Sequence, residues 1–266
     1  TDRDYGGSSG FQTGSTYKIM ALLAWLQAGR GLGETVDASE FKKDQSTYLD
    51  TCADGGGPWG GTWEFQNDSP APKQVTVLQA VSASINSAFA TIGQQVDQCA
   101  IRHLAESLGI HRADGGILQT NPSAILGTNE LAPLTLVSAW AAIANEGKYC
   151  PPIVLDHAVG PTGDELAGQA VVCTQGIDPD LANAAIYAMK GVMNGGTGAA
   201  SNPGDGVPIF GKTGTADGSV QTWIVTSTSR VASVAWAGNI VGKYPLRSFP
   251  GGAYFRHTIM STLMRA

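Results

Sequence analysis

Residues 207–236, with the sequence VPIFGKTGTADGSVQTWIVTSTSRVASVAW, decide the fold. Within this stretch Val207–Gly211, Thr222–Ser227 and Val231–Trp236 are short runs rich in β-branched residues, and turn residues separate them. Such a pattern predicts three strands of an antiparallel meander. Phe255–Met264 follows with apolar side chains at helical spacing, which predicts an amphipathic helix packed on this sheet.

Upstream of the meander the sequence is mostly helical. Apolar periodicity, with proline and glycine near the ends, predicts five helices: Thr16–Ala28, Val75–Val96, Ala100–Leu108, Leu134–Asn145 and Asp180–Met193. The first has apolar residues on nearly every side, so we expect it to be buried all round. Glu34–Pro72 is polar and glycine-rich, and its apolar residues show no helical or strand periodicity. This order predicts an α/β fold in one domain (1–266), with a helical lobe over about 19–205 and a sheet with its C-terminal helix over about 206–266.

The composition limits the classes of partner. The 266 residues carry a net charge of −6, and only 14% of them are charged. Without a basic stripe to neutralise phosphates, we expect no nucleic-acid partner. No apolar run approaches the roughly 20 residues of a membrane span, and no signal peptide opens the chain. Thr1–Gly10 reads like the middle of a domain, so we expect the chain to be a fragment.

The four cysteines indicate the redox compartment. Cys52, Cys99, Cys150 and Cys173 are even in number and widely spaced, with no CxxC pair and no histidine nearby in the pattern of a metal site. A zinc site is therefore not expected. An exported protein with two disulfides is the favoured interpretation, and four reduced core thiols are the alternative.

One pairing of these cysteines follows from a predicted hairpin. Ile153–Val159 and Glu165–Val172 read as two strands around a proline-glycine turn at 161–164. Cys150 and Cys173 lie almost equidistant from that turn, so of the three possible connectivities we expect the one that joins them. The remaining two cysteines then pair with each other.

The first of three chemical motifs is Ser15-Thr16-Tyr17-Lys18, at the start of the buried helix. A serine hydroxyl needs a base within reach, and residues three apart on a helix share a face. Burial in an apolar helix lowers a lysine pKa, so a neutral amine could accept the serine proton. A second copy, Ser39-Glu40-Phe41-Lys42, has no apolar helix behind it and is expected on the solvated surface.

The other two motifs follow in the chain. Ser84-Ile85-Asn86 is expected inside the helix Val75–Val96, where serine and asparagine are unfavourable unless they have a role. Lys212-Thr213-Gly214-Thr215 is expected at the end of a strand, where Gly214 lets a substrate backbone approach the open edge. For both motifs the plain alternative is a solvated polar surface. Each occurs once, and the ordered trio is not expected by chance.

These three motifs form a set known from β-lactamases and penicillin-binding proteins. The sequence resembles the transpeptidase domain of a class A, bifunctional penicillin-binding protein of actinobacterial character. Further similarities occur in family order: GSTYK (14–18), WEFQN (63–67), NELAPL (129–134), ANEG (144–147) and GGTG (195–198). The resemblance implies the penicillin-recognising serine transpeptidase (β-lactamase-like) fold, an antiparallel sheet flanked by helices plus a helical lobe.

The resemblance also implies an activity: acyl transfer between peptidoglycan stem peptides. Ser15 is then the nucleophile that attacks the penultimate D-Ala of a donor, and Lys18 is its base. Ser84 relays a proton to the leaving D-Ala with help from Lys18 and Lys212. The N–H groups of Ser15 and Thr215 form the oxyanion hole, and an acceptor amine takes the acyl group. β-Lactam antibiotics are expected to acylate Ser15, and no cofactor or metal is expected.

Substrate binding is carried over in the same way. Asn86 is expected to bind the substrate amide, and Lys212, Thr213 and Thr215 to hold its terminal carboxylate beside Gly214. The four histidines have no role in this scheme and are expected on the surface or in packing: His103, His111, His157 and His257.

The resemblance carries two further expectations about the whole protein. Family members have strands and, in class A, a glycosyltransferase domain and membrane anchor before the nucleophile, whereas only 14 residues precede Ser15 here. We therefore expect N-terminal strands to be missing from this sheet, and the domain to lie on the extracytoplasmic face of the membrane.

Two rivals remain, a serine β-lactamase and a non-enzymatic β-lactam sensor. A β-lactamase needs a base that activates water against the acyl-enzyme. Glu130 is the acidic residue in the comparable stretch, and we expect it to serve the start of a helix instead.

Overall fold

The computed structural model describes residues 9–52 and 59–265. Its main sheet has three antiparallel strands in the order β11 (Phe210–Thr215), β12 (Gln221–Ser227) and β13 (Ala232–Gly238). The predicted meander is confirmed, with one correction. The motif 212–215 lies within β11 and not after its end, because pairing with the longer β12 extends the strand as far as Thr215.

The described chain also contains seven α-helices. They are α1 (Lys18–Gln27), α2 (Val77–Ala83), α3 (Asn86–Gly93), α4 (Gln98–Ser107), α5 (Pro133–Ala144), α6 (Pro179–Met193) and α7 (Phe255–Leu263). Short strands pair locally: β1 (Phe11–Gln12) with β6 (Glu130–Leu131), β2 (Thr35–Asp37) with β5 (Gln74–Thr76), β3 (Lys42–Asp44) with β4 (Thr62–Glu64), and β7 (Lys148–Tyr149) with β10 (Thr174–Gln175). None of these helices is both long and apolar enough to cross a membrane.

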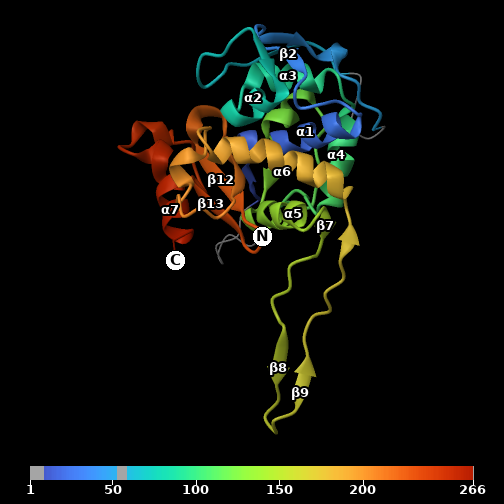
Figure 1. The fold of residues 1–266 in the computed structure, drawn as a ribbon, viewed down its shortest axis with the longest axis vertical. Helices are drawn as coiled ribbons and strands as arrows, with labels where there is room; N and C mark the ends of the chain where they lie inside the picture. Colours follow the sequence, from blue (N-terminus) through green and yellow to red (C-terminus); the bar gives the residue numbers. More distant parts are fainter. Residues whose placement is uncertain (1–8, 53–58, 266) are drawn as a thin grey trace.

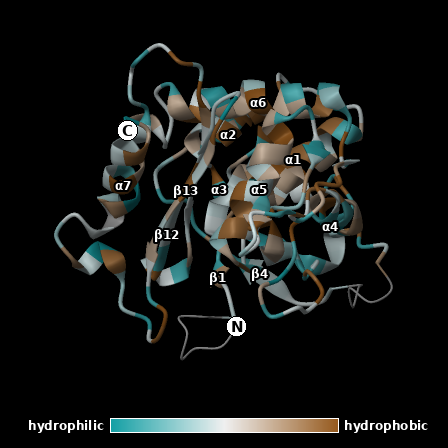
Figure 2. Cartoon of the chain, turned by 90° about the horizontal axis from the view of Figure 1, so that it is seen from below, coloured by the Kyte–Doolittle hydropathy of each residue, from teal (hydrophilic) through white to brown (hydrophobic). Residues whose placement is uncertain are grey.

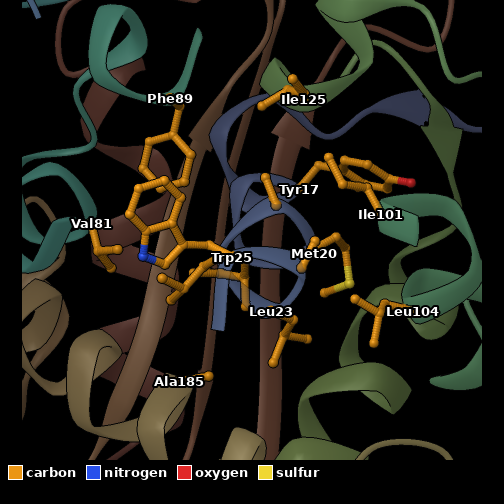
Figure 3. Packing of buried hydrophobic residues seen from close by; sticks show 14 of the residues in the cluster. Tyr17, Met20, Leu23, Trp25, Val81, Phe89, Ile101, Leu104, Ile125 and Ala185 are labelled. Atoms are coloured by element: carbon orange, nitrogen blue, oxygen red, sulfur yellow. The ribbon is translucent and has the colours of Figure 1, made fainter. Parts of the chain in front are cut away.

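Helix α1 forms the centre of the molecule. Every residue from 18 to 25 is buried, as the apolar pattern predicts, and α3, α4 and α6 pack around it (Figure 1). Figure 3 shows Trp25 beside Phe89, and Met20 facing Leu104. Hydrophobic residues are concentrated on α1 in Figure 2. Since each fully buried large apolar side chain stabilises the fold by roughly 1.5–3 kcal/mol, α1 and the residues at its start are held rigidly.

The two faces of the main sheet pack on different elements. Side chains alternate between the faces of a strand. Trp223 and Val225 of β12 belong to the large core that contains α1, whereas Ile224 between them packs with Met260 of α7 in a smaller cluster. In the described residues β13 pairs only with β12. The expectation that further N-terminal strands join the sheet stays a prediction.

The predicted helix over 75–96 is wrong in one respect. It is interrupted at Ser84, which adopts the left-handed conformation (φ 57°, ψ 40°) and ends α2, and α3 begins at Asn86. A left-handed serine is strained, and such outliers cluster at functional sites. The break turns the Ser84 carbonyl and hydroxyl toward α1.

A long hairpin arm projects from the body (Figure 1). Its strands are β8 (His157–Val159) and β9 (Glu165–Ala167), shorter than predicted because most of the arm's side chains are exposed and pack on nothing. Disulfide Cys150–Cys173 closes the base of the arm, with 4.2 Å between Cα atoms. The second disulfide joins Cys52 and Cys99, with 5.1 Å between Cα atoms. Both predicted pairings are confirmed.

Candidate active site

The fold brings all three motifs together. Lys18 is the first residue of α1, Ser84 lies between α2 and α3, and Lys212 lies in β11. The Lys18 ammonium nitrogen donates to the Ser84 carbonyl (2.7 Å) and to Asn86 Oδ1 (2.6 Å), and lies 3.4 Å from Ser84 Oγ. Lys212 Nζ donates to the same Oγ at 2.6 Å. The Ser84 hydroxyl therefore lies between two lysines from distant parts of the chain.

The electrostatics of Lys18 match its predicted role as a base. Its side chain is fully buried, and this burial lowers its pKa to about 7, with the negative charge of Asp68 opposing the shift. A neutral lysine amine has two N–H donors and one lone pair. The Ser84 carbonyl and Asn86 Oδ1 accept the two donors, so the lone pair is available to accept a proton.

Lys212 is also fully buried. Burial holds its pKa well below the ordinary value, and the positive charges of Lys18 and Arg256 lower it further. Its ammonium is directed to Ser84 Oγ and to the Thr213 carbonyl (3.1 Å), and it does not line the cavity that Ser15 faces. The expected direct contact of Lys212 with a carboxylate is therefore not supported, because no part of its side chain is exposed.

Ser15 lies in a short 3-10 turn (Gly14–Thr16) just before α1 and is partly exposed. It opens into a cavity of about 140 Å³ that Ser84, Thr213 and Thr215 also line. Ser15 Oγ makes no hydrogen bond to another described residue. An accessible, unpaired hydroxyl in the same cavity as Ser84, whose hydroxyl lies near the Lys18 amine, suits a nucleophile, since catalytic hydrogen bonds often form only when substrate binds.

Two glycines allow the backbone of β11 to touch the Ser15 turn. A Cβ on Gly14, whose φ is +54°, would lie 2.3 Å from the Thr215 carbonyl oxygen. A Cβ on Gly214 would lie 2.2 Å from the Thr13 carbonyl oxygen. The space expected for a substrate at Gly214 is thus filled by the protein's own turn. In return the backbones of Ser15 and Thr215 come side by side, which an oxyanion hole requires.

Asn86 is engaged on both sides of its amide. Its oxygen accepts from Lys18, and its Nδ2 donates to the Gln66 carbonyl at 2.6 Å. Asn67, which follows Gln66, is hydrogen-bonded to Ser87 through both atoms of its amide: its Nδ2 donates to Ser87 Oγ, and its Oδ1 accepts from the Ser87 backbone N–H. The segment 67–72, part of the region in which the sequence shows no regular spacing of apolar residues, forms one wall of the Ser15 cavity.

Thr197, Arg256 and Asp68 also line the cavity, although no role is predicted for them from the sequence. Thr197 Oγ1 lies 2.7 Å from Thr213 Oγ1, and Arg256 Nη1 donates to Thr215 Oγ1 at 2.8 Å. Asp68 also lines the cavity and pairs with Arg247 at 3.0 Å. The GGTG similarity was a signal for Thr197. Nothing in the local sequence singles out Arg256 or Asp68, because their roles depend on tertiary contacts.

Glu130 lies outside the cavity that Ser15 lines. It lies in β6, paired with β1, while α5 begins at Pro133 with no acidic residue in its first turn and no side-chain cap. The expected helix-start role is therefore wrong, since Ala132 occupies the capping position. Glu130 does not line the cavity that contains Ser15.

The histidines and the second Ser-x-x-Lys copy lie where expected. His103, His111 and His157 are exposed and His257 is buried. Ser39 is exposed in a loop, and Lys42 forms a surface ion pair with Glu64. Among the described residues, one group of histidine, cysteine and acidic side chains is close enough to hold a metal, but two of its three members are the disulfide-bonded Cys52 and Cys99.

Comparisons with known proteins agree on a family. A model of the penicillin binding protein transpeptidase domain matches residues 3–238. Penicillin-binding protein 1A of Mycobacterium tuberculosis is 24% identical over 97% of this chain and 32% of its own length. Penicillin-binding protein 1A of Aquifex aeolicus is 26% identical over 87% of this chain and 30% of its own length. The chain thus spans about a third of these relatives.

Solved structures have the same fold. The penicillin-binding protein PonA1 from Mycobacterium tuberculosis superposes with a TM-score of 0.77 at 22% identity, covering 96% of this chain and 70% of that one. PonA1 in complex with penicillin V superposes with a TM-score of 0.74 at the same identity and coverage. The predicted penicillin-recognising serine transpeptidase fold is confirmed. This chain belongs to the penicillin-binding protein transpeptidase domain family.

Proposed function

We propose that this chain is a serine-type D,D-transpeptidase domain that cross-links peptidoglycan stem peptides through an acyl-enzyme on Ser15. The observation that carries the proposal is the placement of Ser84 Oγ between Lys18 and Lys212, with Ser84 and the accessible Ser15 lining the same cavity. Two buried lysines around one hydroxyl are costly for folding. This cost is understandable if the two lysines transfer protons during the reaction, from the attacking hydroxyl to the leaving group.

Acylation would begin with Ser15 Oγ attacking the carbonyl of the penultimate D-Ala. The lone pair of Lys18 takes the hydroxyl proton as the Oγ–C bond forms. The carbonyl oxygen becomes an anion between the backbone N–H groups of Ser15 and Thr215, which Gly14 and Gly214 allow to lie side by side. Fixed donors of this kind need no reorganisation during the reaction, which makes them effective.

The intermediate then collapses. The C–N bond to the terminal D-Ala breaks, and its nitrogen takes a proton from the Ser84 hydroxyl, which Lys18 or Lys212 replenishes. In the second half-reaction an acceptor amine attacks the ester, loses its proton along the same path and leaves Ser15 free. Asn86 would bind the substrate amide once its bond to Gln66 is exchanged. The hydroxyls of Thr213 and Thr215 would bind the carboxylate.

β-Lactams fit the same site as donors whose leaving group stays attached. Opening of the ring by Ser15 gives an ester that blocks the approach of an amine. The complex of PonA1 with penicillin V supports this reading by similarity of fold.

The serine β-lactamase alternative needs a base for deacylation. Of the described residues that line the Ser15 cavity, the only carboxylate belongs to Asp68, and Arg247 pairs with it. A carboxylate held by a guanidinium is a poor base, which favours the transpeptidase. The sensor alternative retains acylation but lacks transfer to an amine.

The setting of the domain is also proposed. Two disulfides suit the oxidising, extracytoplasmic side of the membrane. The resemblance to class A penicillin-binding proteins implies a membrane anchor and a glycosyltransferase domain elsewhere in the whole protein. One experiment separates the three functions: label the protein with a fluorescent penicillin, then supply a D-Ala-D-Ala peptide with an acceptor amine. Labelling with peptide transfer supports the transpeptidase, rapid loss of label the β-lactamase, and stable label without transfer the sensor.

A further inference from the structure

Arg256 is the cation that lines the cavity beside Ser15. It lies near the start of α7 and faces the same space as Ser15, Thr213 and Thr215. Lys18 and Lys212 are also nearby, but both are fully buried behind the cavity wall. Of these three cations, Arg256 is the one that a bound substrate can touch.

Of Lys18, Lys212 and Arg256, Arg256 is also the side chain that stays most fully protonated at neutral pH. Burial lowers the pKa of Lys18 to about 7 and that of Lys212 well below its ordinary value. Burial lowers the pKa of Arg256 only to about 10, so its guanidinium stays charged at neutral pH. At pH 7 the permanent positive charge at this end of the cavity belongs to Arg256.

The geometry leaves part of the guanidinium available. The two N–H groups of Nη1 are shared among three acceptors: the Gly214 carbonyl (2.8 Å), Thr215 Oγ1 (2.8 Å) and Thr222 Oγ1 (2.9 Å). Nη2 makes no hydrogen bond to a described residue. Because Thr215 Oγ1 accepts from Arg256, its own proton is free to be donated elsewhere. Two donors, Nη2–H and the Thr215 O–H, thus lie next to each other.

His257 holds the guanidinium in place. Arg256 Nε donates to His257 Nε2 at 3.1 Å, and His257 Nδ1 lies 2.8 Å from Ser201 Oγ. Burial, followed by the charge of Arg256, lowers the pKa of His257 to about 4, so the ring is neutral and its Nε2 remains an acceptor. The guanidinium is therefore oriented before any ligand arrives, which reduces the entropy lost on binding.

Asp68 is the other charged side chain that lines the cavity. Its carboxylate pairs with Arg247 at 3.0 Å, on the exposed rim. The two rim charges offset each other, so the charge of Arg256 sets the preference of the cavity for an anion.

We propose that Arg256 binds the free carboxylate of the acyl donor, together with Thr215, and is the specificity-determining residue for a carboxylate-terminated donor. The proposal rests on the proposed acylation of Ser15. It moves the charge recognition that resemblance assigns to Lys212 onto a residue of the C-terminal helix. A donor without a free carboxylate should therefore acylate Ser15 slowly.

The test compares benzylpenicillin with its methyl ester, which lacks the negative charge. For each protein the second-order acylation rate constant is measured with both compounds, and their ratio is the readout. The ratio is internal to one sample, so a change in the folded fraction cancels. The proteins are the parent, Arg256→Gln, Arg256→Lys and the control Arg230→Gln, which removes an exposed guanidinium from the turn between β12 and β13.

A charge-assisted hydrogen bond discriminates by roughly 10-fold to 100-fold, so we expect the parent to prefer the acid by at least about 10-fold. Arg256→Gln should bring the ratio close to one, Arg256→Lys should give an intermediate value, and Arg230→Gln should keep the parent ratio. A parent without preference, or an Arg256→Gln ratio within about twofold of the parent, overturns the proposal.

The remaining outcomes are also decisive. If Arg256→Gln does not fold, a Lys variant with the parent ratio overturns the proposal, and one with a reduced ratio supports it. Failure of the proposed function is separate: it would appear as penicillin labelling that survives Ser15→Ala.

Discussion

The burial of Lys18 sets a pH dependence for the acylation of Ser15. An amine with the ordinary lysine pKa of 10.5 is neutral in about one molecule in 3,000 at pH 7, whereas a pKa of about 7 leaves about half of the molecules neutral. The difference corresponds to about 5 kcal/mol between the two protonation states. This is the free energy by which burial in α1 prepares the base.

The direction of the effect follows from the role of the neutral amine. Below pH 7 Lys18 is protonated and cannot accept the Ser15 proton, so we expect the acylation rate constant to fall about tenfold per pH unit. Above about pH 8 it should be constant. Rapid-quench measurements with a fluorescent penicillin between pH 5 and 9 give this profile directly.

Two substitutions test whether Lys18 is the group that causes this pH profile. Lys18→Ala should lower the plateau by about 10²–10⁴-fold and remove the inflection near pH 7. Lys42→Ala changes the lysine of the exposed Ser39 copy and should leave the curve unchanged. A rate independent of pH from 5 to 9 in the parent, or an inflection near pH 10, would refute the assignment of Lys18 as the base.

The same shift has a consequence for stability. Between pH 7 and about 9 the folded chain releases the Lys18 proton while the unfolded chain keeps it, so the free energy of unfolding should rise with pH. Urea unfolding of the parent and of Lys18→Met checks this, because the variant should have a smaller slope over the same range. An equal slope in both proteins would mean that Lys18 is already charged in the folded chain.

Two further outcomes are expected. The penicilloyl ester on Ser15 should persist for hours after excess drug is removed, because Asp68 is paired with Arg247 and Glu130 does not line the cavity. Intact-mass spectrometry checks this, and loss of the adduct within seconds would favour the β-lactamase alternative. Gly214→Ala should lower the acylation rate constant by about 100-fold or more, because its Cβ would collide with the Thr13 carbonyl and displace Thr215 from Ser15. Gly31→Ala is the control, because the nearest atom to its added Cβ is Glu34 Oε1 at 3.9 Å, and equal rates in the two variants would contradict the proposed oxyanion hole.

The sequence predicts much of the fold because several signals are local. The β-branched runs of the meander, the apolar α1 and the turn of the hairpin arm all depend on neighbouring residues. The disulfides follow from that hairpin and from the number of cysteines. The break between α2 and α3 has no comparable signal. At this break the Ser84 carbonyl accepts a hydrogen bond from Lys18, which is 66 residues away in the sequence.

The candidate site is predictable to a smaller extent. The motifs identify Ser15, Lys18 and Ser84, which the structure brings into one site. They do not show that Lys212 is enclosed or that Arg256 lines the cavity. Both facts depend on how β11 and α7 pack, and the spacing of residues along one chain segment contains no such information.

The most direct test of the central claim is the fate of Ser15. The parent, Ser15→Ala and Ser39→Ala are incubated with penicillin, and the modified peptide is identified by mass spectrometry of a digest. We expect one penicilloyl group on the peptide that contains Ser15 in the parent and in Ser39→Ala, and none in Ser15→Ala. Covalent labelling that persists in Ser15→Ala, or that maps to another residue, would contradict the proposed acyl-enzyme.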